Sequence, residues 1–246
     1  MTKLRFLAMS AVAICASPVH AANCPAPVDQ ALRLVLVTAS SMNTATAKMQ
    51  LFERAAAHLS WTQASEIEPA VIGQAGLSWG LPFLRYKQGG DMEKREGDKR
   101  TPAGFFRIGP SFGFAPSNLP GYIHVKAGKT VCIEDPTSPH YNKIVNRSQI
   151  SGDIHADEMR RTPLYRRGLF VNYPSDRAGR RGSCIFIHIW QAPTKGTAGC
   201  VGLPESRVEA LQEFSKVRAV LAVLPEHALD RFPDCLPRSL PAMRTR

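Results

Sequence analysis

Several kinds of segment are missing from this sequence of 246 residues. Beyond the N-terminal region, no apolar run approaches the roughly 20 residues that cross a bilayer, so no membrane span is expected. No repeat or low-complexity stretch occurs. The 31 Lys and Arg residues are spread along the chain without a basic block interleaved with aromatics, which argues against a nucleic-acid partner. Close ligand pairs such as Cys-x-x-Cys or His-Glu-x-x-His are also absent, so no metal site is expected.

The first 21 residues have the order of a secretory signal peptide. Two basic residues, Lys3 and Arg5, precede an apolar stretch over residues 6–16, and a small-residue site ends at Ala21. This order of charge, short apolar run and cleavage site is typical of exported proteins. The sequence therefore predicts removal of residues 1–21 and a mature protein in the periplasm.

The 225 residues that follow Ala21 suit one domain. We expect that domain over residues 22–224 and a Pro-rich, basic tail over residues 225–246. The signal carries two positive charges and no acidic residue, so the formal net charge of +11 becomes +9 in the mature chain. Such a surface favours anionic surroundings, for example a peptidoglycan layer or lipid headgroups.

Five cysteines remain after cleavage, an odd number for an oxidising compartment. They are Cys24, Cys132, Cys184, Cys200 and Cys235. At most two disulfides can form within one chain, so at least one thiol is left over, and its sequence context points to Cys200. Cys24 could pair with Cys235 and staple the two ends together, which would leave Cys132 with Cys184. Four cysteines allow three connectivities, so the pairing stays open.

Strand patterns dominate the chain, because short apolar runs alternate with Gly and Pro turns. The predicted strands cover residues 32–38, 47–51, 69–72, 105–108, 122–125, 131–133, 169–173, 184–190 and 219–224. Helix signals are few. Residues 157–166 form one candidate, weakened by Pro163, and a better one begins at Pro204 with Val208, Leu211 and Phe214 on one face. The expected fold is mainly β with a few short peripheral helices.

Residues 182–203 are the most informative about chemistry. Alternation along the strand at 184–190 places Cys184, Phe186 and His188 on one face. After a turn, Gly199 permits a backbone conformation that other residues resist, and the amides of Gly199 and Cys200 could bind an oxyanion. A base such as His188 would activate the Cys200 thiol. Taken alone, half of a disulfide and a satisfied core histidine explain these two residues equally well.

The whole string resembles the catalytic motif of the L,D-transpeptidase catalytic-domain (YkuD-like) family, in which a His precedes a Ser/Thr-x-Gly-Cys segment by a short loop. On this resemblance His188 is the base, Thr197 the hydroxyl position, Gly199 the glycine and Cys200 the nucleophile. Residues 96–106 look like the family's upstream GDxxTPxGxF stretch. The resemblance runs from about residue 32 to residue 224 and implies a YkuD-like β-sandwich or barrel catalytic domain.

Acyl transfer on peptidoglycan stem peptides through a cysteine thioester is the activity that the resemblance implies. That chemistry needs no metal or organic cofactor, and a monomer is expected. A cross-linking transpeptidase is the main interpretation, and the resemblance to a divergent branch leaves a non-standard linkage open. A carboxypeptidase or endopeptidase would share the same acyl-enzyme, and a non-catalytic wall-binding module is the alternative from another class. Ser183 or a backbone carbonyl is expected to orient His188.

Two positions depart from the family pattern. Ala198 and Gly202 stand where many members carry polar residues, which leaves the acceptor specificity and the third member of a catalytic triad open.

Similarity to a divergent proteobacterial branch adds candidates for the substrate cleft. These candidates are Asp135, Tyr141, Asn142, His155 and Trp190. Simpler interpretations exist: Asp135 can begin a turn before Pro136, Asp157 and Glu158 can begin a helix beside His155, and Trp190 can be a core or rim aromatic.

Overall fold

Eight strands close into a ring at the centre of the protein. The computed structural model describes residues 24–237, so the predicted signal peptide lies outside the described residues. Strand β1 (Arg33–Ala39) runs parallel to β14 (Ala219–Pro225) and antiparallel to β2 (Thr46–Glu53). The order β1-β14-β6-β11-β12-β13-β4-β2 therefore returns to β1, which gives a closed, barrel-like sheet. The mainly β fold predicted from the sequence is confirmed.

The other strands extend or complete this ring. They are β3 (Thr62–Gln63), β4 (Glu68–Val71), β5 (Leu77–Trp79), β6 (Thr101–Gly113), β7 (Ile123–His124), β11 (Arg167–Asn172), β12 (Phe186–Ile189) and β13 (Val201–Leu203). Strands β5 and β7 pair with β6, and β3 pairs with β2.

Strand β6 is longer than the strand predicted at residues 105–108, since it continues through Pro110. The register between β6 and β11 shifts between Leu169 and Val171, opposite Pro110. Proline, which lacks an amide hydrogen, is tolerated in a strand at such a bulge.

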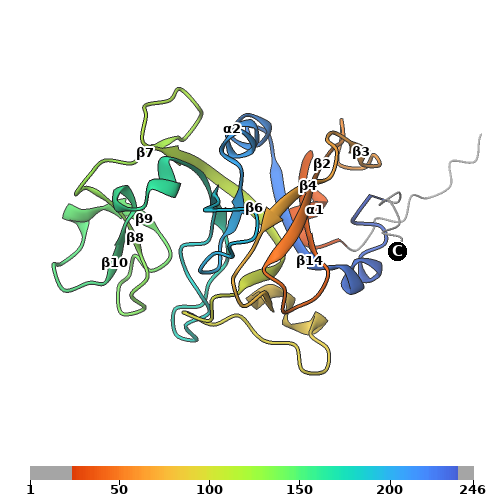
Figure 1. Cartoon of the computed structure of the whole chain (residues 1–246), viewed down its shortest axis with the longest axis horizontal. Helices are drawn as coiled ribbons and strands as arrows, with labels where there is room; N and C mark the ends of the chain where they lie inside the picture. The colour runs from red at the N-terminus through yellow and green to blue at the C-terminus, as the bar shows by residue number, and fades with distance from the viewer. Residues whose placement is uncertain (1–23, 238–246) are drawn as a thin grey trace, which may run out of the picture.

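A second, three-stranded sheet lies at one end of the long axis, away from β14 (Figure 1). It consists of β8 (Thr130–Ile133) between β9 (Ile144–Asn146) and β10 (Ala156–Glu158). Cys132 on β8 forms a disulfide with Cys184, just before β12, so this sheet is tied covalently to the ring. We call this unit the side sheet.

Helices are short and peripheral, as predicted. The α-helices are α1 (Ala26–Asp29) and α2 (Glu205–Phe214), and the 3-10 helices are η1 (Leu81–Tyr86), η2 (Arg147–Gln149), η3 (Met159–Arg161), η4 (Pro163–Arg166) and η5 (Glu226–Arg231). Helix α2 begins directly after Pro204 and buries Val208 and Leu211, in agreement with the sequence pattern. No helix within residues 24–237 combines the length and apolarity that crossing a membrane requires.

The helix predicted over residues 157–166 is wrong. Its first residues belong to β10, and the remainder is split into η3 and η4. Pro163 lacks the amide hydrogen of a helix interior and disfavours helical backbone in the residue before it, so the segment breaks into two single turns.

The two ends of the described chain meet. Cys24 and Cys235 form a disulfide, and the indole nitrogen of Trp61 donates to the Cys235 carbonyl at 3.0 Å. Phe232 is buried and packs edge-on against Phe105, with ring centroids 4.9 Å apart. The segment assigned to a tail from residue 225 thus packs onto the domain up to residue 237, because its apolar side chains complete the core and its cysteine is bonded.

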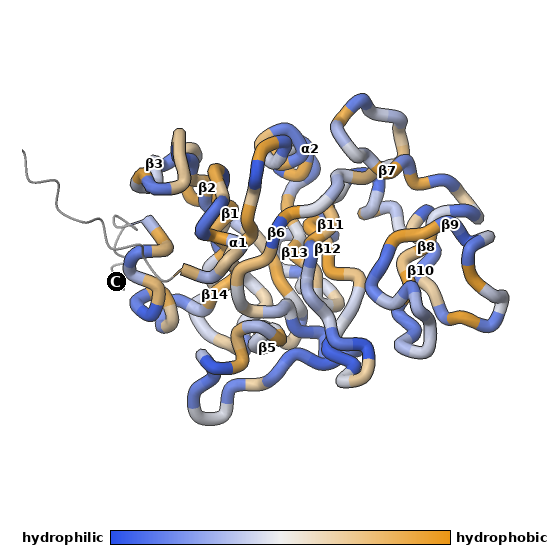
Figure 2. Tube along the Cα trace, turned by 180° about the vertical axis from the view of Figure 1, so that it is seen from behind, coloured by the Kyte–Doolittle hydropathy of each residue, from blue (hydrophilic) through white to orange (hydrophobic). Residues whose placement is uncertain are grey.

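Hydropathy follows the strands of the ring (Figure 2). The strand β14 is buried along its whole length, as are β12 and β13. The loops around the ring are largely hydrophilic in Figure 2. Strands β12 and β13 therefore form a rigid base for any side chain placed at their ends.

Candidate active site

Strand β12 separates two clusters of buried side chains. Ile185, Ile187 and Ile189 belong to the main core, whereas Cys184 and Phe186 belong to a smaller cluster with Cys200. This division confirms the alternation predicted from the sequence. The parallel pairing of β12 with β13 sets His188 opposite Gly202 and Ile187 opposite Val201, so His188 and Cys200 are on the same face of the sheet.

Cys200 is a free, buried thiol with 8% of its surface exposed. Its sulfur accepts a hydrogen bond from the Phe186 amide at 3.3 Å and donates to the Cys184 carbonyl at 3.6 Å. The other four cysteines of the described chain are paired as Cys24–Cys235 and Cys132–Cys184. Both suggested pairings and the assignment of Cys200 as the free thiol are confirmed.

Two threonine hydroxyls hold the backbone at Cys200. Thr197 Oγ1 donates to the Cys200 carbonyl at 2.7 Å, and Thr101 Oγ1 donates to the same oxygen at 2.9 Å. Gly199 has a φ of +143°, and a Cβ atom there would lie 3.1 Å from the Arg100 carbonyl. The glycine is therefore required by both the conformation and the close approach of the neighbouring loop.

The Gly199 amide, which the sequence suggested for an oxyanion hole, donates to Thr197 Oγ1 at 3.1 Å. The Thr197 hydroxyl therefore accepts from the Gly199 amide and donates to the Cys200 carbonyl, and these two bonds fix the turn that carries the thiol.

His188 is buried and oriented by a backbone carbonyl. Its Nδ1 lies 2.7 Å from the Ile189 carbonyl oxygen. Because a carbonyl can only accept, Nδ1 carries the hydrogen, and the neutral ring keeps an unprotonated Nε2. Tyr165 packs edge-on against the imidazole, with ring centroids 5.2 Å apart. The ring is thus held in the tautomer that a general base needs.

The pKa values describe a neutral resting pair. Burial lowers the pKa of the His188 imidazole to about 4, although its hydrogen bond to Ile189 opposes this effect. Burial raises the pKa of the Cys200 thiol to about 12, opposed in part by the Phe186 amide. Among the described residues, no hydrogen bond joins His188 to Cys200. Proton transfer from sulfur to imidazole therefore requires the thiol to turn away from the Cys184 carbonyl.

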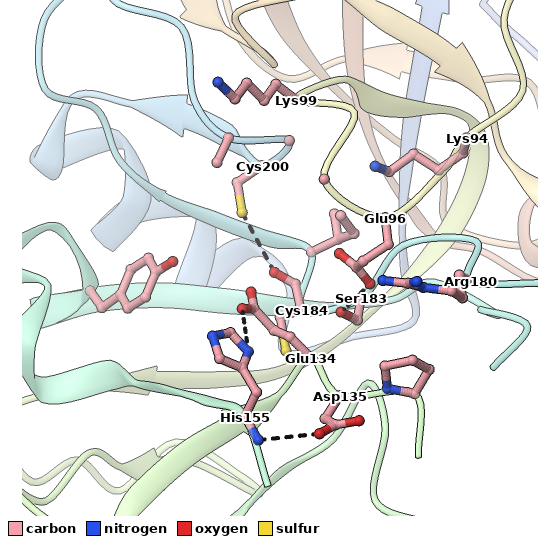
Figure 3. Close-up of a pocket in the computed structure, with 16 residues that line it drawn as sticks. Lys94, Glu96, Lys99, Glu134, Asp135, His155, Arg180, Ser183, Cys184 and Cys200 are labelled. Carbon is pink, nitrogen blue, oxygen red and sulfur yellow. Dashed lines mark hydrogen bonds and ion pairs between the residues drawn. The ribbon is translucent and has the colours of Figure 1, made fainter. Parts of the chain in front are cut away.

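A pocket of about 550 Å³ opens beside the thiol. One wall comes from the ring and its loops, and the other comes from the side sheet (Figure 3). Its lining residues are Lys94, Glu96, Gly97, Lys99, Glu134, Asp135, Pro136, His155, Tyr165, Arg180, Ser183, Cys184, Ile185, Ala198, Gly199 and Cys200. The Cys132–Cys184 disulfide links the two walls.

The candidates for the substrate cleft are divided by the structure. Asp135 and His155 line the pocket, and the Asp135 carboxylate accepts from the His155 amide at 3.3 Å. Tyr141 and Asn142 lie behind the wall. The Tyr141 hydroxyl donates to Glu96 at 2.5 Å, and the Asn142 side chain accepts from the Cys184 amide at 2.9 Å.

Trp190 and Ser183 differ in position. Trp190 follows β12, is not among the pocket-lining residues, and donates its backbone amide to Leu203 at 2.8 Å. Ser183 lines the pocket, but its hydroxyl donates to Glu96 at 2.7 Å rather than to His188. Of the two groups expected to orient His188, the backbone carbonyl therefore has the geometry to do so.

Several pocket residues were not predicted. Glu96 accepts from both Tyr141 and Ser183, Glu134 lines the pocket directly after β8 of the side sheet, and Tyr165 lines it from η4. The upstream GDxxTPxGxF stretch carried a signal, since it contains Thr101, which binds the Cys200 carbonyl. Glu134 is the neighbour of the predicted Asp135 but carries no motif of its own, and Tyr165 reaches the pocket from η4, outside the motif at residues 182–203.

Asp98 organises the upstream stretch. Its carboxylate accepts from the amides of Arg95 and Arg100 at 2.9 Å each, from the Ser78 hydroxyl at 3.0 Å and from the buried Lys94 ammonium at 2.5 Å. These bonds hold the loop that precedes Thr101, whose hydroxyl in turn binds the Cys200 carbonyl.

No group of three or more His, Cys, Asp or Glu side chains between residues 24 and 237 is placed to hold a metal ion.

The family described as L,D-transpeptidase catalytic domain (YkuD) matches residues 43–223. The chain therefore belongs to the YkuD family, as its motifs predicted. No curated protein matches the sequence. Among solved structures, the chain is similar to the crystal structure of the helical cell shape determining protein Pgp2 (K307A mutant) from Campylobacter jejuni, with 16% identity and a TM-score of 0.40. The match covers 79% of this chain and 47% of that one, so this chain spans about half the length of that protein.

Proposed function

We propose that this protein is a periplasmic L,D-transpeptidase that cross-links peptidoglycan stem peptides through a thioester on Cys200. One observation carries the proposal: a single free thiol faces a pocket, while every other cysteine of residues 24–237 is bonded in a disulfide. An exported protein gains little from an unpaired buried cysteine unless its sulfur reacts. Family membership supports acyl transfer as the reaction.

Acylation begins when the Cys200 sulfur attacks a stem carbonyl carbon. The thiol proton passes to Nε2 of His188, and the S–C bond forms as the carbonyl oxygen becomes an oxyanion. Collapse of this intermediate breaks the C–N bond, and the imidazolium returns the proton to the leaving amine of the terminal D-amino acid. The Nδ1–H bond to Ile189 keeps the imidazole in one tautomer throughout.

A second stem completes the reaction. Its amine attacks the thioester carbon, the S–C bond breaks, and the amine proton returns to sulfur through His188. Water in place of the amine would give a shortened stem. The two outcomes share the acyl-enzyme and differ in the nucleophile that resolves it.

Purified protein incubated with muropeptides tests this function. Mass spectrometry is expected to detect products heavier than either stem, together with the released amino acid, and Cys200→Ala should form neither. Products that are all shorter than the donor would assign the chain to the hydrolases. An unchanged muropeptide pool with wild-type protein would favour a wall-binding module and overturn the proposal.

A further inference from the structure

Uncommon backbone conformations gather around the pocket. The non-glycine residues with positive φ in the described chain are Lys99, Asn142, Arg180 and Cys184, at +56°, +61°, +48° and +52°. Three of them line the pocket, and the fourth, Asn142, binds the Cys184 amide. Each such conformation costs on the order of 1 kcal/mol and persists because its surroundings fix it. The residues with these costly backbone conformations therefore either line the pocket or bind a residue that lines it.

Hydrogen bonds fix the backbone on both sides of Lys99. The carboxylate of Asp98 binds the amides of Arg95 and Arg100, on both sides of Lys99, and the Lys99 carbonyl accepts from Ala75 at 3.0 Å. Two residues later, Thr101 binds the Cys200 carbonyl. The backbone that carries Lys99 is thus fixed relative to Cys200.

The Lys99 ammonium is available to a ligand. Within residues 24–237 no hydrogen bond or ion pair engages it, whereas the Lys94 ammonium binds the Asp98 carboxylate. Figure 3 shows Lys99 next to the loop of Cys200, while Arg180 lies on another side of the pocket beside Glu96 and Ser183.

The opposite wall of the pocket is acidic. Glu134 and Asp135 lie beyond the thiol from Lys99 (Figure 3). Burial raises the pKa of Glu134, and the nearby carboxylates of Asp157 and Glu96 raise it further, while His155, whose Nδ1 lies 3.8 Å from the Glu134 carboxylate, opposes them. A further carboxylate is therefore disfavoured on that side. An anionic ligand that reaches Cys200 is attracted by Lys99 and repelled by Glu134 and Asp135. Its negative group is therefore expected on the Lys99 side of the thiol.

We propose that Lys99 determines donor specificity by binding the free carboxylate of the terminal D-amino acid that leaves during acylation. This inference rests on the proposed function, since it assigns a direction to the donor stem in the same site. Lys99 touches the substrate away from the reacting carbonyl, so its role is recognition, and the attack itself belongs to Cys200. Because the ammonium is exposed, the contribution is modest, about fivefold in affinity, and it decreases with added salt.

Binding in the Cys200→Ala background tests this inference without chemistry. The probes are a synthetic stem tetrapeptide that ends in D-alanine and the same peptide with a C-terminal carboxamide, measured by calorimetry at low and high salt. The acid is expected to bind about fivefold more tightly than the amide. Lys99→Met should abolish that preference and leave the amide unchanged, and Lys99→Arg should restore it.

Arg180→Met is the matched control, because it removes one positive charge from the same pocket. It should keep the preference for the acid, and all variants should unfold at the same temperature. The inference is overturned when Lys99→Met retains the preference, when Arg180→Met abolishes it, or when neither peptide binds. Acylation of wild-type protein is scored separately, so peptide binding without acylation would refute the proposed function and leave the role of Lys99 standing.

Discussion

The two threonines that clamp the Cys200 carbonyl should contribute unequally to stability. Thr101 is completely buried, and its hydroxyl also accepts from the buried Gly73 amide at 2.8 Å. Thr101→Val keeps the shape but leaves that amide unsatisfied, which costs about 2 kcal/mol. Thr197 is partly exposed, so water can replace its bond to Gly199, and Thr197→Val should cost about 1 kcal/mol.

The double variant shows whether the hydroxyls act on one oxygen. Each single variant leaves the Cys200 carbonyl with one hydroxyl, whereas the pair leaves it with none. The combined loss should therefore exceed the sum of the single losses by about 0.5–1 kcal/mol.

Urea denaturation followed by circular dichroism, with both disulfides intact, measures these free energies. Thermal scans should show a decrease of about 4–8 °C for Thr101→Val. Thr62→Val on the exposed strand β3 is the control and should change stability by less than about 0.5 kcal/mol. A Thr101→Val protein as stable as this control would refute the buried clamp.

Three further predictions concern charge and covalent links. The folded protein keeps His188 neutral down to about pH 4, whereas the unfolded chain protonates it below about pH 6.5. The free energy of unfolding should therefore decrease by about 3 kcal/mol as the pH falls from about 6.5 to about 4. His188→Gln should lack this component in urea titrations at each pH. Asp98→Asn leaves the Lys94 ammonium, which is 3% exposed, without its charged partner. The variant should lose about 3–5 kcal/mol of unfolding free energy in urea denaturation, and adding Lys94→Met should recover part of this loss. Equal stability of Asp98→Asn and wild type would contradict this pairing. Replacing both Cys24 and Cys235 by Ala opens a link across 211 residues and should cost up to about 5 kcal/mol, while a thiol assay in denaturant of protein that begins at residue 22 should still count one free sulfur. An unchanged unfolding midpoint would show that the ends are held by other contacts.

Local patterns were sufficient for most strands. Alternation at 47–51 and the apolar runs at 32–38 and 219–224 each correspond to a strand of the ring, because burial on one or both faces imposes those patterns. The closure of the ring was not predictable in the same way. It depends on β1 pairing with both β2 and β14, and β14 is almost 200 residues away in sequence.

The candidate site was predictable where the motif is local. Thr197, Gly199 and Cys200 fall within one loop, and the structure shows the hydrogen bonds that make each residue type necessary there. Glu134 directly follows β8 and is adjacent to the predicted Asp135, but no motif singled it out. Tyr165 lies on η4, outside the motif at residues 182–203, and reaches the pocket only through the packing of η4 against β12. Tyr141 and Asn142 were assigned to the cleft, but their side chains support its wall from behind.

The most direct test of the account is the intact mass of the protein after incubation with a carbapenem or a stem tetrapeptide. We predict one covalent adduct that peptide mapping places on Cys200, its absence in Cys200→Ala, and its formation at least about 100-fold more slowly in His188→Gln despite an unchanged melting temperature. An unmodified wild-type protein, or an adduct that forms equally fast without the imidazole, would contradict a thiol activated by His188.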